Sequence, residues 1–157
     1  MGYEFNADEI FAMAEQIEKN GAAFYRKAAE SLSDAAEKEF LLDLARMEDE
    51  HEETFKKMRA ALSDAARTAT VFDPQGEAEQ YLKALADTRV FFEKELDTGS
   101  LEALLKDAVT AEKDSIVFYL GIQDLVPEGL GKAALDGIIR EEMNHIKLLS
   151  KKLISLK

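Results

Sequence analysis

The two histidines of the sequence each follow a glutamate by three positions, in the pairs Glu48/His51 and Glu142/His145. The apolar residues around the first pair are Leu41, Leu44, Phe55, Met58 and Leu62. Together with Glu48 and His51, they are spaced by alternating steps of three and four, which is the pattern of the buried face of a packed helix. Glu48 and His51 fall on the same face, so both side chains are expected to be buried. A buried carboxylate costs several kcal/mol unless a partner neutralises it. The partner that fits this residue pattern is a metal ion.

The two pairs belong to an internal repeat. When the chain is shifted by 94 positions, from His51 to His145, the first half aligns with the second half without a gap. The shift also aligns Glu18 with Glu112. Each half therefore has one lone glutamate and one Glu-x-x-His pair, and the predicted metal ligands are Glu18, Glu48, His51, Glu112, Glu142 and His145.

These six side chains predict a site for two metal ions. Four buried carboxylates carry about four negative charges, which two divalent cations cancel. Carboxylates can bridge two ions, and repeat symmetry suggests that Glu48 and Glu142 lie near both of them, with each histidine as a terminal ligand. Oxygen and nitrogen ligands without sulfur suit iron or manganese, with zinc as an alternative.

The alternative without a metal is that these residues are exposed helix acids with two incidental histidines. Their positions on the buried face and the gapless repeat disfavour this alternative. Other acids near the motifs are interpreted as solvated, because their counterparts in the other half are not all acidic: Glu15, Asp49, Glu50, Glu52, Glu53 and Glu141. Arg46 and Arg140 are also interpreted as solvated.

Tyr25 and Tyr119 each follow a predicted ligand glutamate by seven positions, two turns along the same helix face. Two interpretations remain open for them. They pack in the core, or their phenols donate hydrogen bonds to a ligand carboxylate or a bound oxygen species.

Four long helices are needed to position these residues. Asn6 with Glu9, and Asp34 with Glu37, predict two helix starts as capping boxes, and Ser100 can cap a third helix. The predicted helices run from Asn6 to about Ser31, from Asp34 to about Ala65, from Leu101 to Leu125 and from Lys132 to Leu156. We therefore predict an all-α antiparallel four-helix bundle built from two repeated helix pairs, with halves at about 6–66 and 100–157.

The long crossover between the halves, about 67–99, is predicted to begin with a connector at Arg67–Asp73 and to contain an additional helix at Pro74–Leu96. We find no strand pattern in the sequence.

The composition limits the classes of function. The 157 residues suit a single domain, 1–157, and an apolar fraction of 46% suits a folded core. A net charge of −12 argues against nucleic acid as a partner. No apolar run is long enough to span a membrane. The N-terminus has no features of a signal peptide, so the expected location is the cytoplasm.

The motifs at Ile17–Tyr25, Glu48–His51, Glu112–Tyr119 and Glu142–His145 resemble, in order, the four helix motifs of the rubrerythrin branch of the ferritin-like superfamily. This resemblance covers nearly the whole chain and implies a ferritin-like bundle, two iron ions and a homodimer. It also implies reduction of hydrogen peroxide to water, as the di-iron site cycles between ferrous and ferric states.

The sequence departs from the rubrerythrin pattern in two ways. Typical members carry a cysteine-ligated rubredoxin domain, but this sequence has no cysteine, so the electrons are expected from an external donor protein such as a rubredoxin. Typical members also have an extra glutamate one turn from the lone glutamate of the third helix, where this sequence has Val109 and Ser115. Two alternatives therefore stay open: a ferroxidase or iron-handling protein that reacts with oxygen, and a non-catalytic module stabilised by metal.

Overall fold

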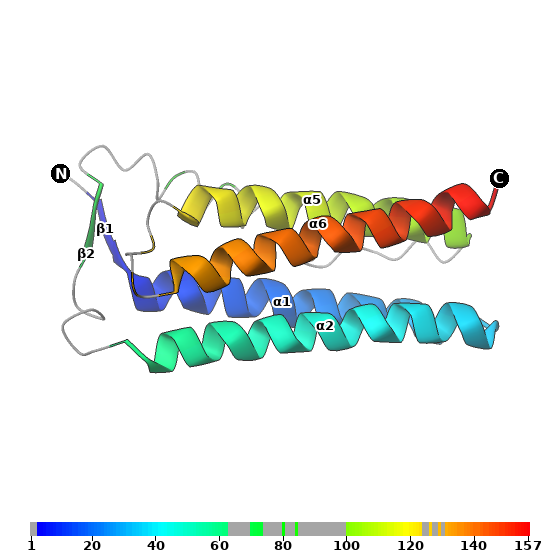
Figure 1. The fold of residues 1–157 in the computed structure, drawn as a ribbon, viewed down its shortest axis with the longest axis horizontal. Helices are drawn as coiled ribbons and strands as arrows, with labels where there is room; N and C mark the ends of the chain where they lie inside the picture. The colour runs from blue at the N-terminus through cyan, green and yellow to red at the C-terminus, as the bar shows by residue number, and fades with distance from the viewer. Residues whose placement is uncertain are drawn as a thin grey trace.

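The computed structural model describes residues 3–62, 70–73, 80, 84, 100–123, 126, 129 and 131–157. The elements in chain order are β1 (Tyr3–Asn6), α1 (Ala7–Glu30), α2 (Ala35–Ala60), β2 (Thr70–Asp73), α5 (Leu101–Gln123) and α6 (Lys132–Ser155). The four long helices lie side by side in one bundle (Figure 1). None of the described helices is long and apolar enough to cross a membrane.

The bundle consists of two antiparallel helix pairs, α1 with α2 and α5 with α6 (Figure 1). The pairs pack together through α1 against α5 and α2 against α6. Helices α2 and α5 run in the same direction, so α2 ends at the opposite end of the bundle from the start of α5 (Figure 1). This order places the lone glutamates on two adjoining helices and the two Glu-x-x-His pairs on the other two.

The starts of α2 and α5 follow from side-chain caps. The carboxylate of Asp34 accepts a hydrogen bond from the Glu37 backbone N–H at 2.9 Å. The Ser100 hydroxyl accepts one from the Ala103 N–H at 3.1 Å. Each cap satisfies an N–H that would lack an intrahelical partner, an effect worth about 0.5–2 kcal/mol. The predicted starts of α2 and α5 are confirmed.

Aromatic residues fill the core around the middle of the bundle. The largest fully buried side chains include Tyr25, Tyr119, Phe11, Phe55 and Phe118. The Phe55 and Tyr119 rings lie 5.4 Å apart, and those of Phe118 and Tyr119 lie 5.9 Å apart, edge to face. Close packing of these large rings restricts the side chains between them to one arrangement.

Two sequence predictions about secondary structure were wrong. Helix α2 ends at Ala60, before the predicted end near Ala65, and the Ala61 N–H bonds to the Lys57 carbonyl as a cap. Strands β1 and β2 pair antiparallel, with Tyr3 opposite Asp73, although no strand was predicted. A strand of four residues is too short to show a periodic pattern, and its partner is distant in sequence. The additional helix predicted at Pro74–Leu96 lies outside the described residues, apart from residues 80 and 84.

Candidate metal centre

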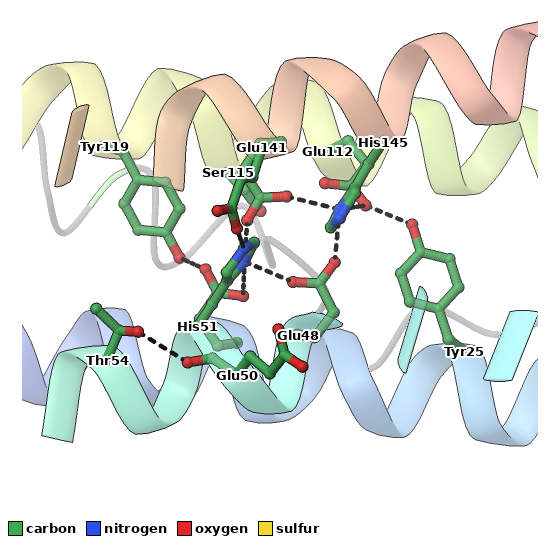
Figure 2. Close-up of polar contacts among 12 residues, drawn as sticks. Tyr25, Glu48, Glu50, His51, Thr54, Glu112, Ser115, Tyr119, Glu141 and His145 are labelled. Carbon is green, nitrogen blue, oxygen red and sulfur yellow. Dashed lines mark hydrogen bonds and ion pairs between the residues drawn. The ribbon is translucent and has the colours of Figure 1, made fainter. Parts of the chain in front are cut away.

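The six predicted ligands converge in the middle of the bundle (Figure 2). Helices α1 and α5 each supply the lone glutamate, and α2 and α6 each supply a Glu-x-x-His pair. All six side chains are buried, with relative exposures of 2% or less. They form two groups of four, in which one ligand atom from each residue lies within 4.8 Å of the others.

The first group surrounds His51. The Nδ1 atom of His51 lies 2.9 Å from Oε1 of Glu142, 3.4 Å from Oε2 of Glu18 and 3.5 Å from Oε2 of Glu48. The ring nitrogen thus faces three carboxylates, one from each of three helices.

The second group surrounds His145 in the same way. Its Nδ1 atom lies 3.1 Å from Oε2 of Glu142, 3.2 Å from Oε1 of Glu48 and 3.3 Å from Oε1 of Glu112. The two imidazole rings are nearly parallel, at 17°, with centroids 5.6 Å apart. Glu48 and Glu142 belong to both groups, and each directs one oxygen to either histidine. Their positions between the groups are those that the repeat suggested for bridging carboxylates.

Most of the inward-facing atoms of this site have no hydrogen-bond partner. Among the described residues, the buried atoms without one include Glu48 Oε1, His51 Nδ1, Glu112 Oε2, Glu142 Oε1, Glu142 Oε2 and His145 Nδ1. They approach one another closely but without the directions that a hydrogen bond requires. An unsatisfied buried polar atom costs about 1–3 kcal/mol, so this many of them together are unfavourable unless cations bind between them. The donor atoms present therefore fit two metal ions.

The carboxylates respond to burial in two different ways. Burial and repulsion from neighbouring carboxylates raise the pKa values of Glu48 and Glu142 well above 4.5. Burial alone would also raise the pKa values of Glu18 and Glu112. For these two, contacts with a histidine, a neighbouring carboxyl group and a tyrosine hydroxyl outweigh burial and lower the pKa. These shifts favour the protonated form of the shared carboxylates and the ionised form of the lone carboxylates.

The histidines take up protons in this environment. Burial by itself would lower their pKa values, but close contact with three carboxylates outweighs it in each case. The pKa of His145 rises to about 12, and that of His51 also rises strongly. Without cations, the contacts of the site thus favour protons on both imidazoles and on the shared carboxylates.

Tyr25 and Tyr119 connect the two halves of the bundle. The Tyr25 hydroxyl donates a hydrogen bond to Oε1 of Glu112, and the Tyr119 hydroxyl donates one to Oε1 of Glu18 (Figure 2). Burial and the nearby carboxylates raise the pKa of both phenols well above 10, so they remain protonated donors. Both are also fully buried. The two interpretations left open by the sequence, core packing and hydrogen bonding to a carboxylate, therefore both hold.

Glu141 is a contact residue that sequence reasoning missed. Its side chain is 63% exposed, but its Oε2 atom contacts Nε2 of His51 (Figure 2). Glu141 was interpreted mainly as a solvated acid; its side chain is exposed, as that predicts, but its contact with His51 was not predicted. The available signal was its position directly before Glu142. Arg46, by contrast, is exposed and pairs with surface acids, as predicted.

The positions of the extra rubrerythrin glutamate supply no carboxylate here. Ser115 is buried, and its hydroxyl donates a hydrogen bond to the Ala111 carbonyl at 3.1 Å. Val109 is a partly buried residue packed against the core. Among the described residues, the carboxylates of the two groups are therefore those of Glu18, Glu48, Glu112 and Glu142.

Comparison with known proteins establishes the fold class. No protein-family model and no curated protein sequence matches the chain. Among solved structures, the chain resembles a protein from Thermotoga maritima assigned as a ferritin-like diiron-carboxylate protein, with a TM-score of 0.72, 22% identity and 99% of each chain covered. The chain thus has the ferritin-like four-helix fold, with two buried Glu/His groups that are candidates for a dimetal site.

Proposed function

We propose that this protein is a di-iron oxidoreductase of the rubrerythrin type, which reduces hydrogen peroxide to water with electrons from an external donor. One observation carries the proposal. Two groups, each with one histidine and three carboxylates, share Glu48 and Glu142, so two cations can bind side by side between them. A glutamate from each of two helices and a Glu-x-x-His pair from each of the other two is the arrangement typical of ferritin-like di-iron carboxylate proteins.

Iron is the metal that best fits these ligands. Nitrogen and oxygen donors without sulfur suit iron, and they accommodate manganese or zinc as well. The similar Thermotoga maritima protein is itself assigned as a diiron-carboxylate protein, which supports iron over the other two. When bound, a ferrous pair supplies the two electrons that convert one hydrogen peroxide and two protons into two water molecules.

The side chains of this chain have separate tasks in the proposed site. Glu18 and Glu112 each serve one cation, and the tyrosine hydroxyls hold their carboxylates in place. Each histidine serves one cation through Nδ1. Glu48 and Glu142 would hold both cations, since each has one oxygen directed to His51 and the other to His145. The surrounding aromatic residues exclude water from the site.

The 157-residue sequence has no cysteine with which to hold a rubredoxin-type iron, which supports a separate molecule as the source of electrons. We propose a small electron-transfer protein such as a rubredoxin as the donor, and a homodimer as the functional form. Both follow from the rubrerythrin resemblance. The net charge of −12 favours a donor that presents basic residues around its own redox centre.

A ferroxidase is the second candidate, and Ser115 favours it. A buried serine bonded to the backbone carbonyl of Ala111 occupies a position where rubrerythrins can carry an additional ligand glutamate. Without that glutamate, the site could oxidise iron with oxygen in place of turning over peroxide.

Stopped-flow spectroscopy distinguishes the two candidates. The anaerobic, reduced di-iron protein is mixed with hydrogen peroxide or with oxygen, and its reoxidation is timed. Fast reoxidation by peroxide and slow reoxidation by oxygen supports the peroxide reductase. The reverse order would reject it in favour of the ferroxidase. Stoichiometric zinc in protein from the native host would count against both and support a non-catalytic module.

The ligand assignment has its own test. Glu48→Ala and His145→Ala should each lower the metal content below two ions per chain. Glu50→Ala is the matched control, because Glu50 is an exposed acid next to His51 in sequence. If both ligand variants retained two ions per chain, the assignment would be wrong.

A further inference from the structure

The contacts that face the interior of the candidate metal centre are nearly the same in its two halves. Both histidines turn Nδ1 toward three carboxylates, at 2.9–3.5 Å around His51 and at 3.1–3.3 Å around His145. The hydrogen bond from Tyr25 to Glu112 has its counterpart in the bond from Tyr119 to Glu18. These inner contacts therefore do not distinguish the metal position beside His51 from the one beside His145.

The outer nitrogens of the histidines break this symmetry. Nε2 of His51 contacts the carboxylate of Glu141. The 94-residue shift aligns Glu141 with Met47, so the repeat position that supplies this carboxylate carries a thioether side chain in the other half. Within the part of the chain that the structure describes, no hydrogen bond to Nε2 of His145 is found. The repeat therefore supplies a carboxylate to His51 and no corresponding carboxylate for His145.

This difference changes how well each imidazole can bind a metal. A carboxylate that accepts a hydrogen bond from Nε2–H fixes the tautomer whose free Nδ1 lone pair faces the metal, orients the ring and makes the nitrogen a stronger donor. A thioether sulfur is only a weak acceptor. Among the described residues, no carboxylate at the repeat-equivalent position fixes the tautomer or the ring orientation of His145.

We infer that the two metal positions are inequivalent: the position beside His51 binds a divalent cation more tightly and fills first, and the position beside His145 is the exchangeable one. Glu141 acts as the positioning residue for His51. This inference rests on the proposed dimetal site. Each position keeps one oxygen of Glu48 and one of Glu142, so the difference between the two positions comes from Glu141.

Calorimetric titration of the metal-free protein with Co²⁺, followed by visible absorption, tests the inference. Two binding steps are expected, with dissociation constants at least about tenfold apart. Glu141→Ala should weaken the tighter step by about 10–100-fold and leave the weaker step within about twofold. Glu141→Gln keeps a hydrogen-bond acceptor without the charge, so it should weaken the tighter step less than Glu141→Ala does. Glu141 is mostly exposed, so neither variant disturbs core packing, and circular dichroism checks the fold.

Two histidine variants assign the binding steps to the two metal positions, and two further variants test the role of Glu141. His145→Ala should abolish the weaker step and His51→Ala the tighter one. Met47→Glu should strengthen the weaker step, a gain that a merely structural role of Glu141 would not produce. Glu50→Gln removes the same charge near His51 and should change neither step.

The outcomes separate the inference from the proposed function. Two steps of equal affinity, or a tighter step that Glu141→Ala leaves unchanged, would overturn the inequivalence and leave the dimetal site standing. Binding of fewer than two Co²⁺ ions by the wild-type chain would overturn both.

Discussion

Loading the metal-free protein with two divalent cations should release about four protons at neutral pH. In the metal-free site, the raised pKa values favour protons on Glu48, Glu142 and both imidazoles, and the lowered pKa values favour ionised lone carboxylates. With all four protons bound, two imidazolium charges would balance two carboxylate charges. In a site that held two divalent cations, four ionised carboxylates and two neutral imidazoles would surround them. Both states are neutral overall, and they differ by the protons on those four groups.

Isothermal titration calorimetry measures this release. The metal-free protein is titrated with Co²⁺ at about pH 7 in several buffers whose ionisation enthalpies differ. The slope of the observed enthalpy against the buffer enthalpy gives the number of protons released. Glu48→Gln is the matched variant, because a glutamine cannot carry the exchangeable proton, and it should lower the release by about one.

A release of about two protons would refute the charge balance. It would mean that only the imidazoles are protonated in the metal-free protein and that both shared carboxylates are ionised. A release near zero would show in addition that the histidines are neutral before metal binds. Either result would mean that burial and mutual repulsion do not keep these groups protonated at neutral pH.

Three other predictions concern stability. The raised pKa of His145, about 12, gives the metal-free protein a stabilisation that is complete below about pH 6.5 and is lost as the pH rises. Its melting temperature should therefore fall between about pH 6 and pH 9 in scanning calorimetry, and a rise would contradict this. Tyr25→Phe removes a hydrogen bond to the ionised Glu112 and should lower the free energy of unfolding in urea by about 1.5–3 kcal/mol; no change would mean that this bond does not form. Phe55→Ala, at a fully buried position, should cost about 3–5 kcal/mol. Leu120→Ala, at an exposed position, should stay within about 0.5 kcal/mol, and equal losses would contradict the described packing.

The helices and the six candidate ligands could be predicted because their signals are local. A helix repeats every 3.6 residues, so Glu48 and His51 could be assigned to the buried face from spacing alone. The internal repeat then identified Glu112, Glu142 and His145 without any coordinates. Helix starts were predictable for the same reason, since Asp34 caps a backbone N–H only three residues away. The end of α2 was not, because no glycine or proline marks Ala61.

Contacts between helices were decided only by the tertiary structure. Periodicity shows which side of a helix is buried, but the crossing geometry of the helices determines which side chains meet. The phenol of Tyr25 reaches Glu112 on α5, and the carboxylate of an exposed Glu141 reaches His51 on α2. The pairing of β1 with β2 depends in the same way on two segments brought together by the bundle. The sequence by itself thus identified the candidate residues of the centre, and the packing of the helices decided how each one is held and where its two halves differ.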